Sequence, residues 1–149
     1  MGSRIWLERM DEAARRLMVI NVNLDSVGGA FGLTALTSGF ERLDVWVKEI
    51  GPRAGLPIAT HLPLMANSDH ANFAAHGIPA VRLLAGFSAP DSNLRLLLTA
   101  ADTRDKVHPD KLDQALRLAT TLTWHALAAA DATLSSLAQR GAIEHSGLV

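Results

Sequence analysis

The sequence predicts an α/β fold in which a partly parallel sheet lies between helices on both of its faces. Short apolar runs of strand length alternate with longer segments whose apolar residues recur at helical spacing. The short runs end at glycine, proline or small polar residues, as strands in such folds do. Only about three such runs occur in 149 residues, so we expect the strands to form part of a larger sheet that is incomplete in this chain.

Composition places the chain among globular proteins and disfavours several functional classes. Apolar residues make up 48% and charged residues 19%, which is enough apolar surface to build a core. The net charge is −1 and no cluster of Lys and Arg is dense, so nucleic acid and membrane surfaces are not expected partners. No cysteine is present, which leaves His and carboxylates as possible metal ligands. We expect a single domain over residues 1–149 with a disordered tail from about residue 141.

The first candidate site residue lies at the end of an apolar, β-branched run. Residues 19–29 read VINVNLDSVGG, so Asp25 follows a predicted strand and two glycines follow soon after it. Ligands in α/β folds bind beyond the carboxyl ends of the strands. A carboxylate at this place can bind a metal, act as an acid or base, or cap the next turn, and the spacing alone favours the capping role.

Two amphipathic helices flank this strand and the glycine-rich loop after it. The first is predicted over residues 3–17, and its apolar face consists of Trp6, Met10, Ala13, Ala14 and Leu17. The loop covers residues 28–32. The second helix begins near Ser38, which forms a capping box with Glu41, and it ends at Gly51 and Pro52.

The pattern in the second half of the chain predicts two more strands and two more helices. Pro57 and Pro63 interrupt an extended stretch and mark it as an edge strand. A short helix is capped by Ser68 and ends at Gly77, and a buried strand follows over residues 78–84. A long helix begins at Pro109, with a break at Asp131 or Thr133. Its predicted buried stripe is Leu112, Leu116, Ala119, Leu122, Ala126, Ala130, Leu134 and Leu137.

Four segments, in order along the chain, resemble one protein family. Residues 23–28 (NLDSVG) resemble an N-L-D-M-V-G strand end, and residues 68–73 (SDHANF) resemble an S-D-H-x-x-F turn. Residues 77–81 (GIPAV) resemble the strand that follows, and residues 99–103 (TAADT) resemble an H-T-x-x-D-T segment before the last helix. These motifs are those of zinc-dependent exopeptidases of the di-zinc aminopeptidase type, whose relatives include glutaminyl cyclases and glutamate carboxypeptidases.

The resemblance implies a phosphorylase/hydrolase-like fold and a hydrolase with two zinc ions and a Glu general base, acting near the amino terminus of a peptide. By this resemblance Asp25 would bind one metal ion. Asp69 would lie near the floor of the site and support the general base, although its place in a first helical turn is also favoured by the helix dipole. Phe73 would line a substrate pocket. The complete parent protein would be exported or periplasmic.

The chain also departs from the family pattern. The upstream half of the family, which supplies the general base and most metal ligands, has no counterpart in these residues, and Leu98 stands where the last His ligand is expected. One carboxylate cannot hold a catalytic zinc ion, which needs about three protein ligands. His61 or His70 could complete the ligands only in a rearranged site. We therefore expect no peptide hydrolysis by the chain alone.

Two other functions remain open at this point. The chain could be a non-catalytic interaction or oligomerisation domain of the same fold, because an exposed sheet edge would favour pairing with a second copy. A nucleotide-binding α/β domain is the third reading. It depends on the glycine-rich loop at residues 28–32 alone, which has neither the GxGxxG spacing nor a following GK[ST].

Overall fold

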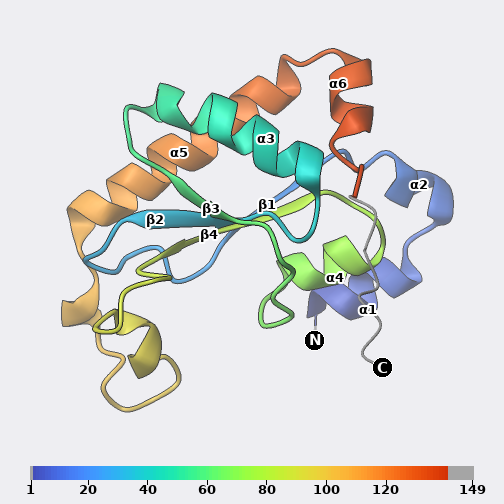
Figure 1. Ribbon diagram of the computed structural model, residues 1–149. Helices are drawn as coiled ribbons and strands as arrows, with labels where there is room; N and C mark the ends of the chain where they lie inside the picture. Colours follow the sequence, from blue (N-terminus) through green and yellow to red (C-terminus); the bar gives the residue numbers. More distant parts are fainter. Residues whose placement is uncertain (1, 141–149) are drawn as a thin grey trace, which may run out of the picture.

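A four-stranded mixed sheet with helices on both faces forms the protein (Figure 1), which confirms the predicted α/β class. The computed structural model describes residues 2–140, so the tail that was predicted to be disordered from about residue 141 lies outside the described residues. The strands follow the order β1-β4-β2-β3 across the sheet. Their bounds are β1 Asn21–Leu24, β2 Leu33–Leu36, β3 Ala59–His61 and β4 Ala80–Ala85.

Strand β4 is the centre of the sheet. It pairs in parallel with β1, with Asn21 opposite Ala80, and antiparallel with β2, which pairs in parallel with β3. All six residues of β4 are buried. Because side chains alternate across a strand, Val81 and Leu83 point to one face of the sheet and Arg82 points to the other.

The helices form a layer on each face of the sheet (Figure 1). Helices α3 (Glu41–Ile50) and α5 (Pro109–Leu127) cover one face, and α1 (Gly2–Arg9) and α4 (His70–Ala75) cover the other. Helices α2 and α6 lie beyond one end of the sheet. The remaining short elements are α2 Glu12–Arg16, α6 Asp131–Ser136 and the 3₁₀ segments η1 Gly51–Ala54, η2 Asn93–Leu96 and η3 Arg104–Lys106.

The main hydrophobic core lies between the sheet and the layer of α3 and α5. Strand β4 contributes Val81 and Leu83, and both helices contribute fully buried side chains. The largest fully buried apolar side chains of this cluster are Phe40, Leu43, Leu83, Leu118, Leu122 and Leu137.

The predicted first helix is divided into two. Helix α1 ends at Arg9 and α2 begins at Glu12, because Asp11 adopts an extended conformation with φ −56° and ψ 138°. The predicted apolar face is also wrong, since Trp6 and Leu17 are exposed and the buried residue of α1 is Leu7. Helix α1 packs on α4, with Trp6 at the rim against Phe73, and Leu7 is the residue of α1 that is fully buried. Arg15 of α2 donates a hydrogen bond to the Leu7 carbonyl, so α2 folds back over the end of α1.

Strand β2 was not predicted, and the start of the next helix was misplaced. The four residues of β2 come directly after the predicted loop at 28–32; they are all buried and show no regular alternation of apolar and polar residues, so their pattern gives no strand signal. Ser38 does not form a capping box: it has φ 58° and its buried hydroxyl has no partner among the described residues. Helix α3 starts at Glu41, and the Thr37 hydroxyl donates to Asp44 in its first turn.

Local signals from glycine and proline predicted several boundaries correctly. Strand β3, which lies between Pro57 and Pro63, is at the edge of the sheet, as predicted. Helix α4 ends just before Gly77, which has φ 76°, in the left-handed region that glycine tolerates. Helix α5 begins at Pro109, and the break in the last helical segment comes where Asp131 begins α6.

The buried stripe of α5 differs from the predicted one in the first half of the helix. Leu112 and Leu116 are exposed, and the buried positions there are Ala115 and Leu118. Ala130, predicted to belong to the same stripe, is exposed as well, because α5 ends at Leu127 and Ala130 precedes α6. The predicted pattern followed the largest apolar residues, whereas the helix turns Ala115 toward the sheet and leaves Leu116 in solvent. Sequence periodicity alone cannot separate two apolar stripes that are one position apart.

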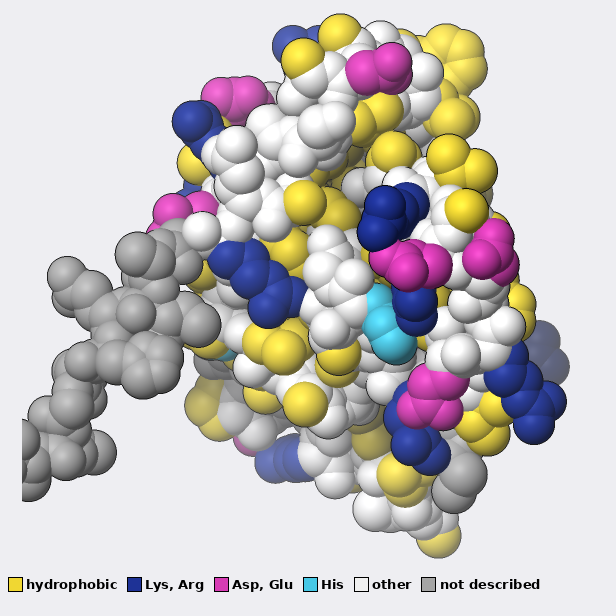
Figure 2. Space-filling view, turned by 90° about the vertical axis from the view of Figure 1, so that its right-hand side faces the viewer, with side chains coloured by type: hydrophobic (Ala, Val, Ile, Leu, Met, Phe, Trp, Pro, Cys, Tyr) yellow, Lys and Arg dark blue, Asp and Glu magenta, His cyan; other side chains and the backbone are white. Residues whose placement is uncertain are grey.

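The face of the molecule that carries α1 and α2 has mixed charge (Figure 2). Lys and Arg side chains alternate there with Asp and Glu, so this face presents no continuous basic patch. Within residues 2–140, no helix combines the length and apolar character needed to cross a membrane.

A pair of substitutions on α5 tests the observed stripe. Leu118→Ala should lower the free energy of unfolding by about 3 kcal/mol, because it leaves a cavity at a fully buried position. Leu116→Ala, at a position 62% exposed, should change it by less than about 0.5 kcal/mol. Urea unfolding followed by circular dichroism measures both values, and equal losses would contradict the observed orientation of α5.

Candidate functional site

The candidate site lies where β1 ends, on the face of the sheet that α4 covers. Asp25 follows the last residue of β1, and Ser26, with φ 64°, then turns the chain away from the sheet. The loop before α4 brings Asn67 and Ser68 to the same place, and β4 contributes Arg82. The site therefore combines residues from two parallel strands and one loop, at the edge of the sheet where α/β proteins bind ligands.

Asp25 is surrounded by donors. The Ser68 hydroxyl donates to Oδ2 of Asp25 at 2.5 Å, and the Ser26 hydroxyl donates to Oδ1 at 3.0 Å. Nη2 of Arg82 lies 3.2 Å from Oδ2, and the Asp25 side chain remains 39% exposed. Burial raises the pKa of Asp25, but the two hydroxyl hydrogen bonds and the charge of Arg82 together outweigh it and lower the pKa below its usual value.

Ser68 has a different role from the predicted one. The structure places Asp69 at the N-cap position of α4, and no side chain provides a cap hydrogen bond there. The Ser68 hydroxyl donates instead to Asp25 and accepts a hydrogen bond from Nδ2 of Asn23 at 3.0 Å. The predicted capping serine therefore belongs to the polar network of the site.

Arg82 is the residue of this site that the sequence analysis missed. Its side chain is 5% exposed, and Nη1 donates to Oδ1 of Asn67 at 2.8 Å. The signal for it was present, because Arg82 is the one charged residue in the apolar strand β4. A charged side chain in a buried strand needs a counter-charge and hydrogen-bond partners, because its burial without them costs free energy.

His70 lies beside this network at the start of α4 and is fully buried. The pKa of His70 lies below its ordinary value. Burial is the largest cause and the charge of Arg82 adds to it, whereas the carboxylates of Asp25 and Asp69 act in the opposite direction. Neither ring nitrogen has a hydrogen-bond partner that meets the usual geometry among the described residues. The imidazole therefore remains neutral near pH 7.

Asp69 lies with Asp25 along an open groove of about 640 Å³. The Ser3 hydroxyl donates to Oδ1 of Asp69 at 2.5 Å, and Nδ2 of Asn72 donates to the Ser3 hydroxyl at 2.8 Å. The residues that line the groove are Asp25, Leu64, Ala66, Ser68, Asp69, Ala71, Asn72 and Ala75. Two carboxylates thus face one groove, and no basic side chain lines it.

The other predicted residues lie away from this groove. Phe73 packs against Trp6, with ring centroids 6.2 Å apart, and does not line the groove. His61 lies on the edge strand β3 against Phe87. Leu98, at the place of the expected His ligand, is fully exposed and has φ 62°. The structure therefore brings Asp25 and Asp69 together, but neither His61 nor Leu98 belongs to their groove.

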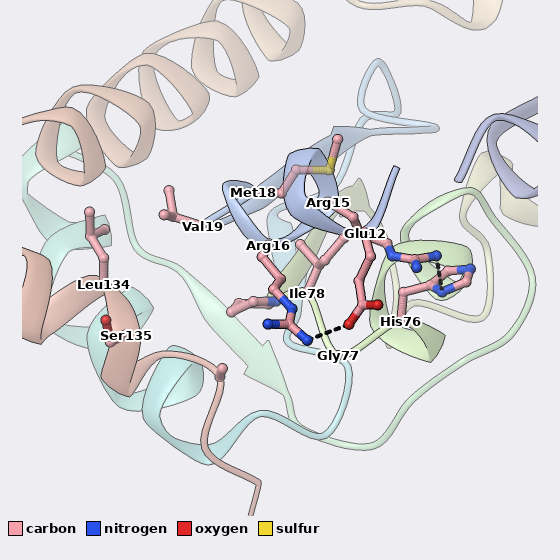
Figure 3. A pocket seen from close by; sticks show the side chains of 12 residues that line it. Glu12, Arg15, Arg16, Met18, Val19, His76, Gly77, Ile78, Leu134 and Ser135 are labelled. Atoms are coloured by element: carbon pink, nitrogen blue, oxygen red, sulfur yellow. Dashed lines mark hydrogen bonds and ion pairs between the residues drawn. The ribbon is translucent and has the colours of Figure 1, made fainter. Parts of the chain in front are cut away.

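A second cavity, of about 460 Å³, opens beyond the amino end of β1 (Figure 3). Its charged side chains already have an ion-pair or hydrogen-bond partner. Arg16 forms an ion pair with Glu12, and Nη1 of Arg15 lies 3.3 Å from Nδ1 of His76. Because these charges already have partners, the cavity offers a less specific ion site than the groove beside Asp25.

Comparison with solved structures identifies the fold. An aminopeptidase from Aneurinibacillus sp. strain AM-1 matches with a TM-score of 0.66 and 24% identity, over 83% of this chain and 29% of that one. Two structures of a zinc aminopeptidase from Bacillus subtilis match with TM-scores of 0.73 and 0.72 and identities of 21% and 22%, over 84% of this chain and 32% of theirs. No protein-family model and no curated protein matches the sequence. The chain therefore has the fold of zinc aminopeptidases and spans about a third of their length.

The described residues do not fit a zinc ion by themselves. Within residues 2–140, no three His, Cys, Asp or Glu side chains come close enough to hold a metal. Three donors, among them the guanidinium of Arg82, already occupy the oxygens of Asp25. A metal at Asp25 would need further ligands from outside these residues, since structural and catalytic zinc sites use three or four protein ligands.

The hydrogen bond from Ser68 to Asp25 predicts a pH-dependent loss of stability. Ser68→Ala should lower the free energy of unfolding at pH 7 by about 1 kcal/mol, a small value because solvent screens the half-exposed carboxylate. It should also raise the pKa of Asp25, which NMR titration of the carboxyl carbon measures.

The sign of this dependence follows from the lowered pKa of Asp25. The contribution of the Ser68–Asp25 hydrogen bond to the free energy of unfolding is complete above the ordinary pKa of an aspartate. It disappears as the pH falls through the folded-state pKa of Asp25. The difference in stability between wild type and Ser68→Ala should therefore shrink as the pH falls from 7 through the acidic range. Ser88→Ala, at an exposed serine, is the control. A stability difference that does not change with pH over this range would show that the carboxylate is not responsible.

Proposed function

We propose that this chain forms the C-terminal part of a zinc-dependent, aminopeptidase-like hydrolase that acts near the amino terminus of a peptide. The observation that carries the proposal is the fold, which matches zinc aminopeptidases over 83–84% of this chain and 29–32% of theirs. The four sequence motifs of the di-zinc aminopeptidase type support the same assignment, and with it the kinship to glutaminyl cyclases and glutamate carboxypeptidases.

Within this proposal, three residues have roles that the resemblance assigns. Asp25 is the metal ligand of this chain, Asp69 supports the general base, and Phe73 contributes to the substrate pocket. The common groove of Asp25 and Asp69 supports the first two roles. Phe73 packs on Trp6 and does not line the groove, so its role in a substrate pocket would be indirect, through the residues packed in front of it. The remaining metal ligands and the general base come from outside the described residues, and Arg82 has to release Asp25 before a metal can bind it.

A complementation experiment tests this proposal. The purified chain with added zinc should hydrolyse no aminoacyl p-nitroanilide, because one carboxylate cannot hold a catalytic zinc ion. The chain combined with a polypeptide encoded upstream of residue 1 should release p-nitroaniline in a zinc-dependent manner. Treatment of the same mixture with a chelator is the control. A folded, zinc-loaded complex that hydrolyses no substrate would refute the proposal.

A specific feature of β1 supports a second candidate, a non-catalytic interaction domain. The backbone amide of Asn21 donates to the carbonyl of Pro79, just before β4, and the amide of Asp25 donates to the carbonyl of Leu83 within β4. Because successive residues of a strand direct their backbone groups to opposite edges, the amides and carbonyls of Val22 and Leu24 face the open edge. Within the described residues, β1 has no neighbour on that side. Its span contains no proline and no charged residue that would block pairing, whereas Pro57 and Pro63 flank β3. Exposed apolar residues next to this edge are Leu17, Val19 and Leu24.

If the open edge of β1 pairs with a second copy, the chain should associate as its concentration rises. Light scattering after size-exclusion chromatography measures the mass, and Leu24→Lys should shift the protein toward the monomer because a charged side chain opposes edge pairing. Thr60→Lys on the other edge strand is the matched control and should leave the mass unchanged. A wild-type monomer at all concentrations would exclude self-association through this edge.

A further inference from the structure

Arg82 is a charged residue in the most buried strand of the sheet. All its neighbours in β4 are apolar, and the strand is paired on both edges. A buried cation is costly unless it has a counter-charge and hydrogen-bond acceptors. The fold must therefore supply an anion close to Arg82, and the site that supplies it is the end of β1.

The contacts of the guanidinium show how this demand is met at its two terminal nitrogens, whereas the buried Nε has no partner among the described residues. Nη2 lies 3.2 Å from Oδ2 of Asp25, and Nη1 donates to Oδ1 of Asn67 at 2.8 Å. Asp25 receives two further hydrogen bonds, from Ser68 and Ser26. A carboxylate accepts about four hydrogen bonds in all, so little of this one remains free for another ligand.

Asp25 and Arg82 form a neutral pair without a metal ion. Asp25 carries the negative charge and Arg82 the positive one, with Nη2 of Arg82 3.2 Å from Oδ2 of Asp25. A zinc ion would lie about 2 Å from the carboxylate oxygen that the guanidinium now contacts. A divalent cation and a buried guanidinium at the same oxygen would repel each other strongly, so the two exclude each other there.

We propose that the guanidinium of Arg82 is the resident cation of this site and takes the place of a metal ion beside Asp25. The carboxylate at the end of β1 then serves as the counter-ion that allows β4 to bury Arg82. This inference goes beyond the proposed function, because it holds for the chain by itself, whatever the rest of a hydrolase contributes. It also predicts that Asp25 can bind a metal in an assembled site only after Arg82 has moved away from it.

A double-mutant cycle tests the pair. Asp25→Asn should lower Tm by about 5–10 °C, because it leaves a buried guanidinium without its counter-ion. Arg82→Met should cost less, since the half-exposed Asp25 can be hydrated when it loses its partner. The double variant should be more stable than Asp25→Asn alone, because no buried charge remains. If Asp25→Asn does not fold, recovery of a folded protein by the added Arg82→Met change supports the pairing equally.

The chain contains a matched control pair of the same residue types. Nη1 of Arg95 lies 3.2 Å from Oδ1 of Asp91, the separation found between Arg82 and Asp25, but both of these side chains are exposed. The cycle of Asp91→Asn and Arg95→Met should be additive within about 1–2 °C, because exposed ion pairs contribute little. Additive changes in the Asp25 and Arg82 cycle as well would overturn the inference.

Zinc titration supplies the second measurement. Zinc chloride at up to a tenfold excess should leave the Tm of the wild type and of Asp25→Asn unchanged, and dialysed protein should retain no zinc by elemental analysis. Zinc that raises the Tm of the wild type and does not raise that of Asp25→Asn would show that Asp25 binds metal despite Arg82, and would overturn the inference. The complementation assay is separate, since its failure leaves the result of this cycle unaffected.

Discussion

Strand β4 is buried on both faces and hydrogen-bonded along both edges, and the rest of the structure depends on this double burial. A strand in this position tolerates apolar side chains and little else. Five of its residues meet that condition and build the core against α3 and α5 or the packing against α4. The sixth, Arg82, has to be neutralised inside the protein, and the parallel register, with Arg82 opposite Asn23, brings the nearby Asp25 within reach.

The polar cluster at the end of β1 is therefore connected to the packing of the sheet. Ser68 and Asn67 come from the loop that leads into α4, and α4 itself covers β4 and β1. The loop thus supplies hydrogen-bond partners to the Asp25–Arg82 pair, and the helix after it covers the apolar surface beside that pair. Stability and the geometry of the candidate site arise from the same contacts, and a change at either affects both.

Similarity in fold shows how a chain is arranged, whereas the residues at the site decide which chemistry it can perform. The fold of this chain matches zinc aminopeptidases, but a scaffold does not by itself provide a reaction. A strand-end aspartate serves as a metal ligand when other ligands surround it, and as a counter-ion when a guanidinium lies beside it. Within the described residues the second arrangement is the one observed at Asp25. The chemistry thus depends on one residue of the neighbouring strand.

The sequence alone predicted the parts of the structure that follow from local stereochemistry. The α/β class, the edge position of β3 between two prolines, the end of α4 before Gly77 and the start of α5 at Pro109 depend on rules that act over a few residues. The family resemblance also pointed to Asp25 and Asp69; the structure places both along one groove, and their roles stay predictions. Such signals survive in any tertiary context, because proline and glycine restrict or extend backbone conformation directly.

The tertiary structure alone decided which faces are buried and which charges meet. Leu7 rather than Trp6, and Leu118 rather than Leu116, enter the interior because of the helices and strands packed against them. Strand β2 exists because β4 and β3 pair with it, since its four residues have no pattern of their own. Asp25 and Ser68 are 43 residues apart in the chain, and no local rule connects them. The partners of a buried charge are set by the three-dimensional register of strands and loops, which periodicity along the sequence does not contain.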